Sequence, residues 1–143
     1  MGSVNAPFGL RLTGRLDSGS LEVFRQYPIA SGYAANIAAG DIVMLTDNGT
    51  STTITKQTAT GDTSADIAML GVFVGCSYTD PSTGWVTYSN MWPTGTVASD
   101  AVAFVVDDPQ ALYVVMADEA ITNSLDIYGK NAAIVQGAVN TTF

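Results

Sequence analysis

Turn-forming residues divide this chain into short runs of apolar and β-branched residues. This division into short segments constrains the fold more than any other feature of the sequence. The turn signals are the segments 47–49 (DNG), 79–84 (TDPSTG), 93–95 (PTG) and 107–110 (DDPQ). Short strands between such turns are typical of antiparallel hairpins. Four hairpin-like units at regular spacing predict an all-β protein, mainly β with one short helix, built as a small β-barrel or sandwich.

The composition supports an ordered single domain. Hydrophobic residues make up 47% of the chain and charged residues only 13%, whereas a disordered chain shows the opposite balance. A length of 143 residues leaves room for one core. We therefore expect an extended N-terminal arm over residues 1–20 and a single β-rich domain over residues 21–143.

The clearest hairpin signal lies around Asn48-Gly49, between residues 40–46 and residues 50–58. Asparagine and glycine tolerate the positive φ that a primed hairpin turn requires. The second arm of this hairpin is rich in threonine and repeats with a period of two. We therefore expect Thr53, Thr55 and Gln57 to form a polar, exposed face.

Two more hairpins are predicted around the later turns. Their arms are residues 67–78 with 85–92, and residues 96–106 with 111–117. The run 67–78 is apolar and rich in valine, which predicts a central strand. Its glycines predict a β-bulge at Gly71 or Gly75.

The N-terminal arm is apolar but cannot be helical. Pro7 and four glycines break a helix, while Phe8, Leu10 and Leu12 are too apolar for a solvated tail. Their alternate spacing predicts a strand that docks either on the chain's own sheet or on a neighbouring subunit.

Residues 118–128 (DEAITNSLDIY) are the best helix candidate. Thr122 could cap this helix, and Leu125 and Tyr128 would face inward. An irregular crossover is the alternative for the same segment.

The ionisable side chains exclude most catalytic chemistry. The chain has no histidine, one cysteine and two lysines, Lys56 and Lys130. Without an imidazole, a serine or cysteine triad has no base, and a zinc site lacks its usual ligands. Neither lysine stands in a phosphate-binding loop. We therefore expect a protein that is not an enzyme and that uses no metal and no cofactor.

The negative charge is concentrated after the first third of the chain. Residues 1–40 hold three arginines against two acids, whereas residues 41–143 hold two lysines against eleven acids, for a net charge of −8. An acidic body repels phosphate backbones, so direct nucleic-acid binding is not expected. No apolar run is long enough for a membrane helix, and residues 1–12 lack the pattern of a signal peptide. The chain is expected to be made in the cytoplasm and to stay or assemble there.

Carboxylates leave two chemical alternatives open. A glycosidase needs only a pair of carboxylates, and Glu22 and Glu119 are the two glutamates. Calcium could bind between Asp62 and Asp66 or at Asp107-Asp108, although no EF-hand loop is present. Four of the eleven aspartates instead stand just before Pro or Asn-Gly, where they are expected to form Asx turns. Those aspartates are Asp47, Asp80, Asp107 and Asp108.

One cysteine and two tryptophans stand in the predicted strands. Cys76 has no Lys, Arg or His within ten residues, so we expect a buried, inert thiol. Trp85 and Trp92 stand seven positions apart, an odd spacing that places them on opposite sides of a regular strand. One of them can therefore be core and the other exposed, where it would suit a sugar platform or a protein anchor.

Several segments together carry a resemblance to a known group of proteins. They are residues 5–10 (NAPFGL), 27–30 (YPIA), 40–45 (GDIVML), 70–81 (LGVFVGCSYTDP), 90–93 (NMWP), 101–109 (AVAFVVDDP) and 129–132 (GKNA). Their order resembles small virion structural proteins of tailed bacteriophages, and it is also similar to head-decoration, or cement, proteins. The resemblance covers nearly the whole chain and carries no catalytic signature. Members of the group continue past a region like residues 137–143, and a missing strand there would leave a sheet edge for a neighbour to cover.

The resemblance implies a β-rich protein on the virion's capsid exterior, often a trimer, which binds the major capsid protein and sister subunits. We expect the arm and the hairpin near residues 79–93 to carry these contacts, and the arm's arginines to pair with acidic groups of the shell. The candidate interface residues are Phe8, Leu10, Arg11, Leu12, Arg15, Leu16, Tyr78, Trp85 and Trp92. A tail or fibre component, or a sugar-binding module that uses Trp85 or Trp92, is the alternative.

Overall fold

The computed structural model describes residues 8–20, 24–58, 69–117, 120–122, 125 and 127–137. The mainly-β prediction is confirmed, because this part of the chain forms ten strands and no α-helix. The strands are β1 (Arg11–Arg15), β2 (Arg25–Pro28), β3 (Ile37–Ala38), β4 (Ile42–Asp47), β5 (Thr52–Lys56), β6 (Gly71–Thr79), β7 (Val86–Ser89), β8 (Met91–Trp92), β9 (Val102–Val106) and β10 (Ala111–Val114).

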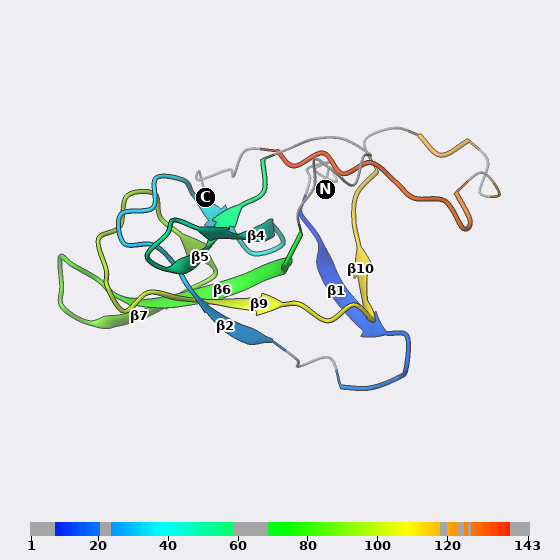
Figure 1. Cartoon of the computed structure of the whole chain (residues 1–143). Helices are drawn as coiled ribbons and strands as arrows, with labels where there is room; N and C mark the ends of the chain where they lie inside the picture. Colours follow the sequence, from blue (N-terminus) through cyan, green and yellow to red (C-terminus); the bar gives the residue numbers. More distant parts are fainter. Residues whose placement is uncertain are drawn as a thin grey trace, which may run out of the picture.

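A sheet of six strands makes up most of the body (Figure 1). Its order is β2-β9-β6-β4-β5, and β7 joins β6 beside β4. The sheet curls until β2 and β5 approach each other, where Ile29 and Ile54 form a single parallel bridge. One bridge does not close the ladder, so the sheet is open and strongly curved, and the barrel, one of the two predicted architectures beside the sandwich, is not formed. The strands β3 and β8 form a short second pair.

β6 is a central strand of the sheet, as the sequence predicted. β6 pairs with β9 on one side and with β4 and β7 on the other. The ladder to β9 shifts between Phe73 and Gly75 and leaves Val74 without a partner, so the irregularity lies directly beside Gly75, one of the two glycines predicted to form a bulge. Gly71 has a different reason to be glycine, because an added Cβ would overlap the carbonyl oxygen of Val106.

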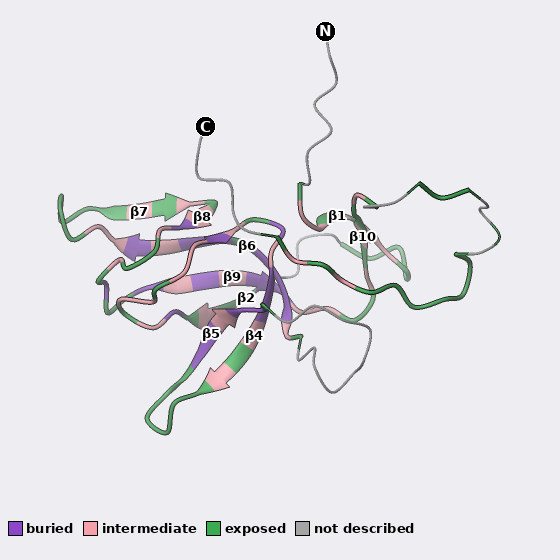
Figure 2. Cartoon of the chain, turned by 90° about the horizontal axis from the view of Figure 1, so that it is seen from above, coloured by how far each residue is buried: buried purple, intermediate pink, exposed green. Residues whose placement is uncertain are grey.

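The core fills the concave side of the curved sheet. Trp92, Phe73 and Ile37 are completely buried there, and Figure 2 shows the buried residues concentrated along β6 and β9. The remaining core residues are Ile29, Val43, Ile54, Cys76, Tyr78, Ala98, Ala101, Ala103 and Val105. The ring of Trp92 packs edge-on against Tyr78, with centroids 5.3 Å apart, and its indole N–H donates to the Tyr33 carbonyl at 3.4 Å.

The hairpin of β4 and β5 is confirmed, but its loop is longer than predicted. Asp47 still pairs with Thr52, so four residues form the loop. Gly49 has a φ of 82° and Asn48 has no positive φ, so the turn is not a two-residue primed turn. In this longer loop the Asn48 side-chain oxygen accepts hydrogen bonds from the N–H groups of Thr50 and Ser51.

The prediction of a polar, exposed face on β5 is wrong. Thr53 and Gln57 are buried, and Thr55 is half-buried. The alternation fails because both faces of the sheet are covered at this end. Lys56 is buried on one face, and Ile42, the neighbour of Gln57, is buried on the other.

The strand β10 pairs with β1 and not with β9, so the predicted hairpin of residues 96–106 with 111–117 is wrong. Both edges of β9 are already occupied, by β2 and by β6, which leaves β10 no free edge there. Beyond the turn 107–110, β10 leaves the sheet and forms a two-stranded ribbon with β1. The arm is therefore docked on its own chain, and the ribbon lies beside one end of the sheet (Figure 1).

The predicted helix over residues 118–128 is not found in its described residues. Leu125 has a 3₁₀ conformation and residues 127–129 form a turn. Leu125 and Tyr128 are exposed instead of facing inward. No helix among the described residues is long and apolar enough to span a membrane.

Candidate interaction surfaces

The β1–β10 ribbon presents a mixed apolar and basic surface. Phe8, Leu16 and Leu112 are exposed on it, while Leu10 and Leu12 are half-buried. The guanidinium of Arg11 lies 5.0 Å from the centre of the Phe8 ring, a cation–π distance. The predicted interface residues of the arm therefore share one ribbon, which sequence reasoning could place only as an extended segment.

Arg15, in contrast, is paired within the chain. Its Nε lies 2.9 Å from an oxygen of Asp108, and its Nη2 lies 3.0 Å from Asp17. Arg25 on β2 contacts the neighbouring Asp107 at 3.1 Å. Of the two arm arginines that were predicted to pair with an acidic shell, Arg15 already contacts two carboxylates of its own chain.

The turn 107–110 contains two aspartates that form ion pairs and hydrogen bonds with other segments. Asp107, the ion-pair partner of Arg25, also accepts a hydrogen bond from the phenol hydroxyl of Tyr27 at 2.7 Å. This hydrogen bond raises the pKa of Tyr27. Asp108 also accepts the Gln110 N–H, as an Asx turn requires. The ion pairs connect the ribbon and β2 to this turn, a role that local sequence does not reveal.

A groove separates the ribbon from the sheet. It has a volume of about 370 Å³ and is lined mainly by apolar residues, among them Phe8, Leu12 and Val74, with Arg11 also in its wall. Val72 and Val106 form its floor and are nearly inaccessible. The Tyr113 hydroxyl donates to the Val106 carbonyl at 3.5 Å and anchors the ribbon over the sheet.

Trp85 and Trp92 differ in exposure, as their odd spacing predicted. Trp92 is fully buried and Trp85 is 76% exposed. Tyr78 is also a core residue, so among the predicted interface residues both Tyr78 and Trp92 are inaccessible in this structure. Tyr88, which is not among the predicted interface residues, is as exposed as Trp85.

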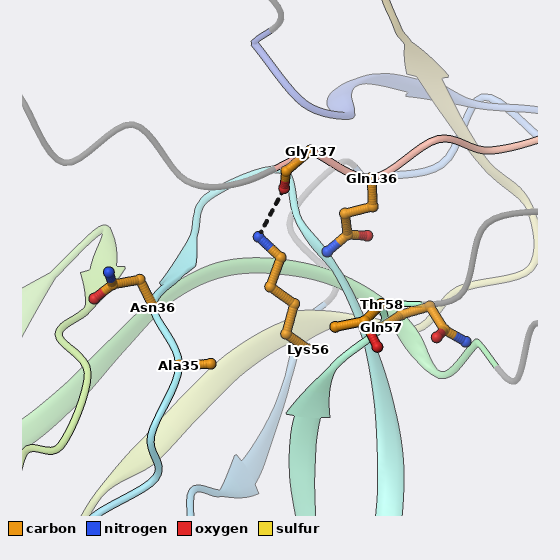
Figure 3. A pocket seen from close by; sticks show the side chains of 7 residues that line it. All are labelled: Ala35, Asn36, Lys56, Gln57, Thr58, Gln136 and Gly137. Carbon is orange, nitrogen blue, oxygen red and sulfur yellow. Dashed lines mark hydrogen bonds between the residues drawn. The ribbon is translucent and has the colours of Figure 1, made fainter.

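A second hollow, of about 340 Å³, lies beside the end of β5 (Figure 3). The ammonium of Lys56 lies 3.0 Å from Asp41 and donates to the Gly137 carbonyl at 3.2 Å. The Gln136 side chain contacts both the N–H and the carbonyl of Ile42. These contacts attach residues 136 and 137 to the sheet, so Lys56 and Gln136 are engaged in structural bonds.

The catalytic and metal alternatives gain no support from the described residues. Glu22, Glu119 and the segment Asp62–Asp66 lie outside the part of the chain that the structure describes. Asp107 and Asp108 are paired with arginines. Within the described ranges no three Cys, Asp or Glu side chains gather as a metal site.

The thiol of Cys76 is buried, as predicted, and burial raises its pKa to about 11. Because the thiolate is the reactive form, we expect a disulfide reagent at pH 8 to label the folded protein at least about 100-fold more slowly than the unfolded chain. The release of thionitrobenzoate, with and without denaturant, measures this ratio. Comparable rates in both conditions would show that β6 opens readily and would contradict the prediction.

Comparisons with protein-family models, with curated proteins and with solved structures find no match to this chain.

Proposed function

We propose that this protein is a structural virion protein that decorates a phage capsid and stabilises it by binding the lattice of the major capsid protein. The observation that carries the proposal is the β1–β10 ribbon, whose apolar and cationic side chains face solvent although the rest of the chain is acidic. An exposed apolar surface of this kind marks a protein contact more often than a catalytic site. The sequence resemblance points to the same function.

A decoration protein needs a stable body and complementary contacts rather than chemistry. Binding to the assembled shell favours that shell by mass action. The curved sheet supplies the body, and the ribbon and the β6–β7 hairpin supply the contacts. In this proposal the protein sits on the capsid exterior after synthesis in the host cytoplasm, contacts sister subunits as a trimer, and binds neither nucleic acid nor a membrane.

The test is binding to capsids that lack the protein, measured by co-sedimentation. Deletion of residues 1–18 removes all of β1, and the core contains none of the described residues of that segment, so the body should fold while binding is abolished. A gentler variant combines Phe8→Ser, Arg11→Ser and Leu16→Ser, which keeps the β1–β10 ladder. We expect its affinity to fall at least about tenfold, because exposed apolar and Arg anchors supply much of a contact's energy.

A matched control is Leu125→Ser, which removes an equally exposed apolar side chain away from the ribbon. Its binding should equal that of the natural chain. Normal capsid binding by the triple variant would contradict the proposed role of the ribbon.

A sugar-binding module is the second candidate, because Trp85 and Tyr88 are both 76% exposed and an exposed aromatic ring can stack on a sugar. Only Trp85 remains available for this role, since Trp92 is buried. Binding to a glycan array that disappears in Trp85→Ala, with Tyr128→Ala unchanged, would favour this candidate over capsid decoration.

A further inference from the structure

We propose that two copies of this chain pair edge to edge through β7, as antiparallel strands related by a twofold axis at Thr87. β7 lies at the rim of the sheet, where Figure 2 shows it largely exposed. It pairs with β6 on one side, and no described strand pairs with its other side. A free strand edge of this kind is a template for another strand.

The register of the β6–β7 hairpin shows which backbone groups point outward. The N–H of Asp80 donates to the Trp85 carbonyl at 2.9 Å, and Tyr78 is opposite Thr87. Hydrogen-bonded pairs alternate along an antiparallel ladder, so Thr87 directs its backbone groups toward β6. Val86 and Tyr88 therefore direct their N–H and carbonyl groups toward the free edge.

Two outward residues separated by one inward residue are self-complementary. When a second β7 runs antiparallel with Thr87 opposite Thr87, Val86 of each copy stands opposite Tyr88 of the other. All four outward groups of each strand then find partners. The two cross-strand pairs combine an aromatic with a β-branched side chain, a favourable combination, and both side chains are exposed in one copy, at 63% and 76%.

The charge distribution favours a second copy as the occupant. The chain carries a net charge of −8, yet no charged residue stands between Asp80 and Asp100, the longest uncharged stretch of the sequence. Two such strands meet without like-charge repulsion. Two other edge strands carry protective residues, since β1 contains Arg11 and Arg15, and β2 contains an arginine and ends at a proline.

The inference is independent of capsid decoration, since it rests only on the edge and its charge. The four-residue strand buries a small area, so we expect the contact to depend on concentration. A trimer has three times the mass of the single chain, which is 14.9 kDa. Pairing through β7 instead doubles the mass of whichever species pairs. The two contacts are thus distinguishable by mass.

The experiment is light scattering of the full chain at increasing concentration, with charge variants at the proposed axis. The natural chain should approach an even multiple of 14.9 kDa. Thr87→Lys and Thr87→Glu each place like charges directly opposite one another, and each should weaken association at least about tenfold. An equimolar mixture of the two variants should recover it, because Lys then faces Glu across the axis.

Thr52→Lys on β5 is the matched control, since Thr52 is an exposed threonine on another strand, and its mass should equal that of the natural chain. Two results would overturn the proposal. One is a natural chain whose mass never becomes an even multiple, which would leave the edge for a strand of a different protein. The other is a pair of charge variants that associate as the natural chain does, or whose mixture gains nothing.

Discussion

Trp92→Ala is expected to lower the free energy of unfolding by about 3–5 kcal/mol, the range for deleting a buried large aromatic side chain. The indole is fully buried, packs edge-on against Tyr78 and donates to the Tyr33 carbonyl. Its strand β8 also joins β3 to the body through the Ile37–Trp92 pair. Urea denaturation followed by circular dichroism measures the change, with an unchanged slope expected for a stability effect.

The chain supplies its own control for this prediction. Trp85→Ala removes the same side chain from a site that is 76% exposed, so its effect should stay within about 0.5 kcal/mol. Trp92→Phe keeps part of the ring volume but loses the N–H donor, and it should lie between the two. Equal losses for Trp85→Ala and Trp92→Ala would contradict the assignment of Trp92 to the core.

Lys56→Met is expected to destabilise the fold by about 3 kcal/mol, because removing one member of a buried ion pair leaves the other charge without its partner. The side chains of Lys56 and Asp41 are only 8% and 15% exposed. After the substitution Asp41 still accepts the hydrogen bond from the Ala38 N–H, at 2.9 Å, but it loses its ion pair with the lysine ammonium. The bond from Lys56 to the Gly137 carbonyl is lost as well. Chemical denaturation provides the measurement.

A double variant separates the buried charge from the lost packing. Adding Asp41→Asn to Lys56→Met removes the uncompensated carboxylate while keeping an acceptor for Ala38. The double variant should therefore recover much of the stability lost by Lys56→Met. Lys130→Met, at an exposed lysine, should change stability by less than about 0.5 kcal/mol. A Lys56→Met variant as stable as Lys130→Met would rule out a structural role for the ion pair.

Local signals predicted the hairpins whose arms are neighbours in the sequence. The Asn48-Gly49 turn does join β4 to β5, and the turn after Thr79 joins β6 to β7. The ladder irregularity beside Gly75 and the opposite exposure of Trp85 and Trp92 also follow from local sequence. Such features depend on turn conformation and on the period of two, and both are properties of short segments.

Predictions failed where a strand's environment depends on distant segments. The turn after β9 resembles a hairpin turn, yet β10 pairs with β1, about a hundred residues away in the sequence. The alternation in β5 predicted an exposed face that other segments cover at Gln57. The residues Leu125 and Tyr128 have a helical spacing, but an amphipathic helix needs a surface to pack against, and both side chains are exposed.

For the candidate surfaces too, some features follow from local sequence and others depend on the whole fold. The sequence could propose an apolar arm, an uncharged second hairpin and one exposed tryptophan, because these depend on composition and spacing alone. Which arginine stays free for a partner depended on the turn 107–110, which brings Asp108 to Arg15. Which strand edge stays open depended on the order of the whole sheet.

The residue pattern alone was enough to predict a mainly-β chain and the position of most strands, and the composition lacks histidine and any cluster of thiols, on which much enzymology depends. Three other features depended on long-range contacts: the sheet curls without closing, β1 and β10 leave it as a ribbon, and β7 remains an open, uncharged edge. This difference arises because turns and strands form from the preferences of a few neighbouring residues. Burial, ion pairing and free edges instead depend on which distant segments already occupy the space beside them.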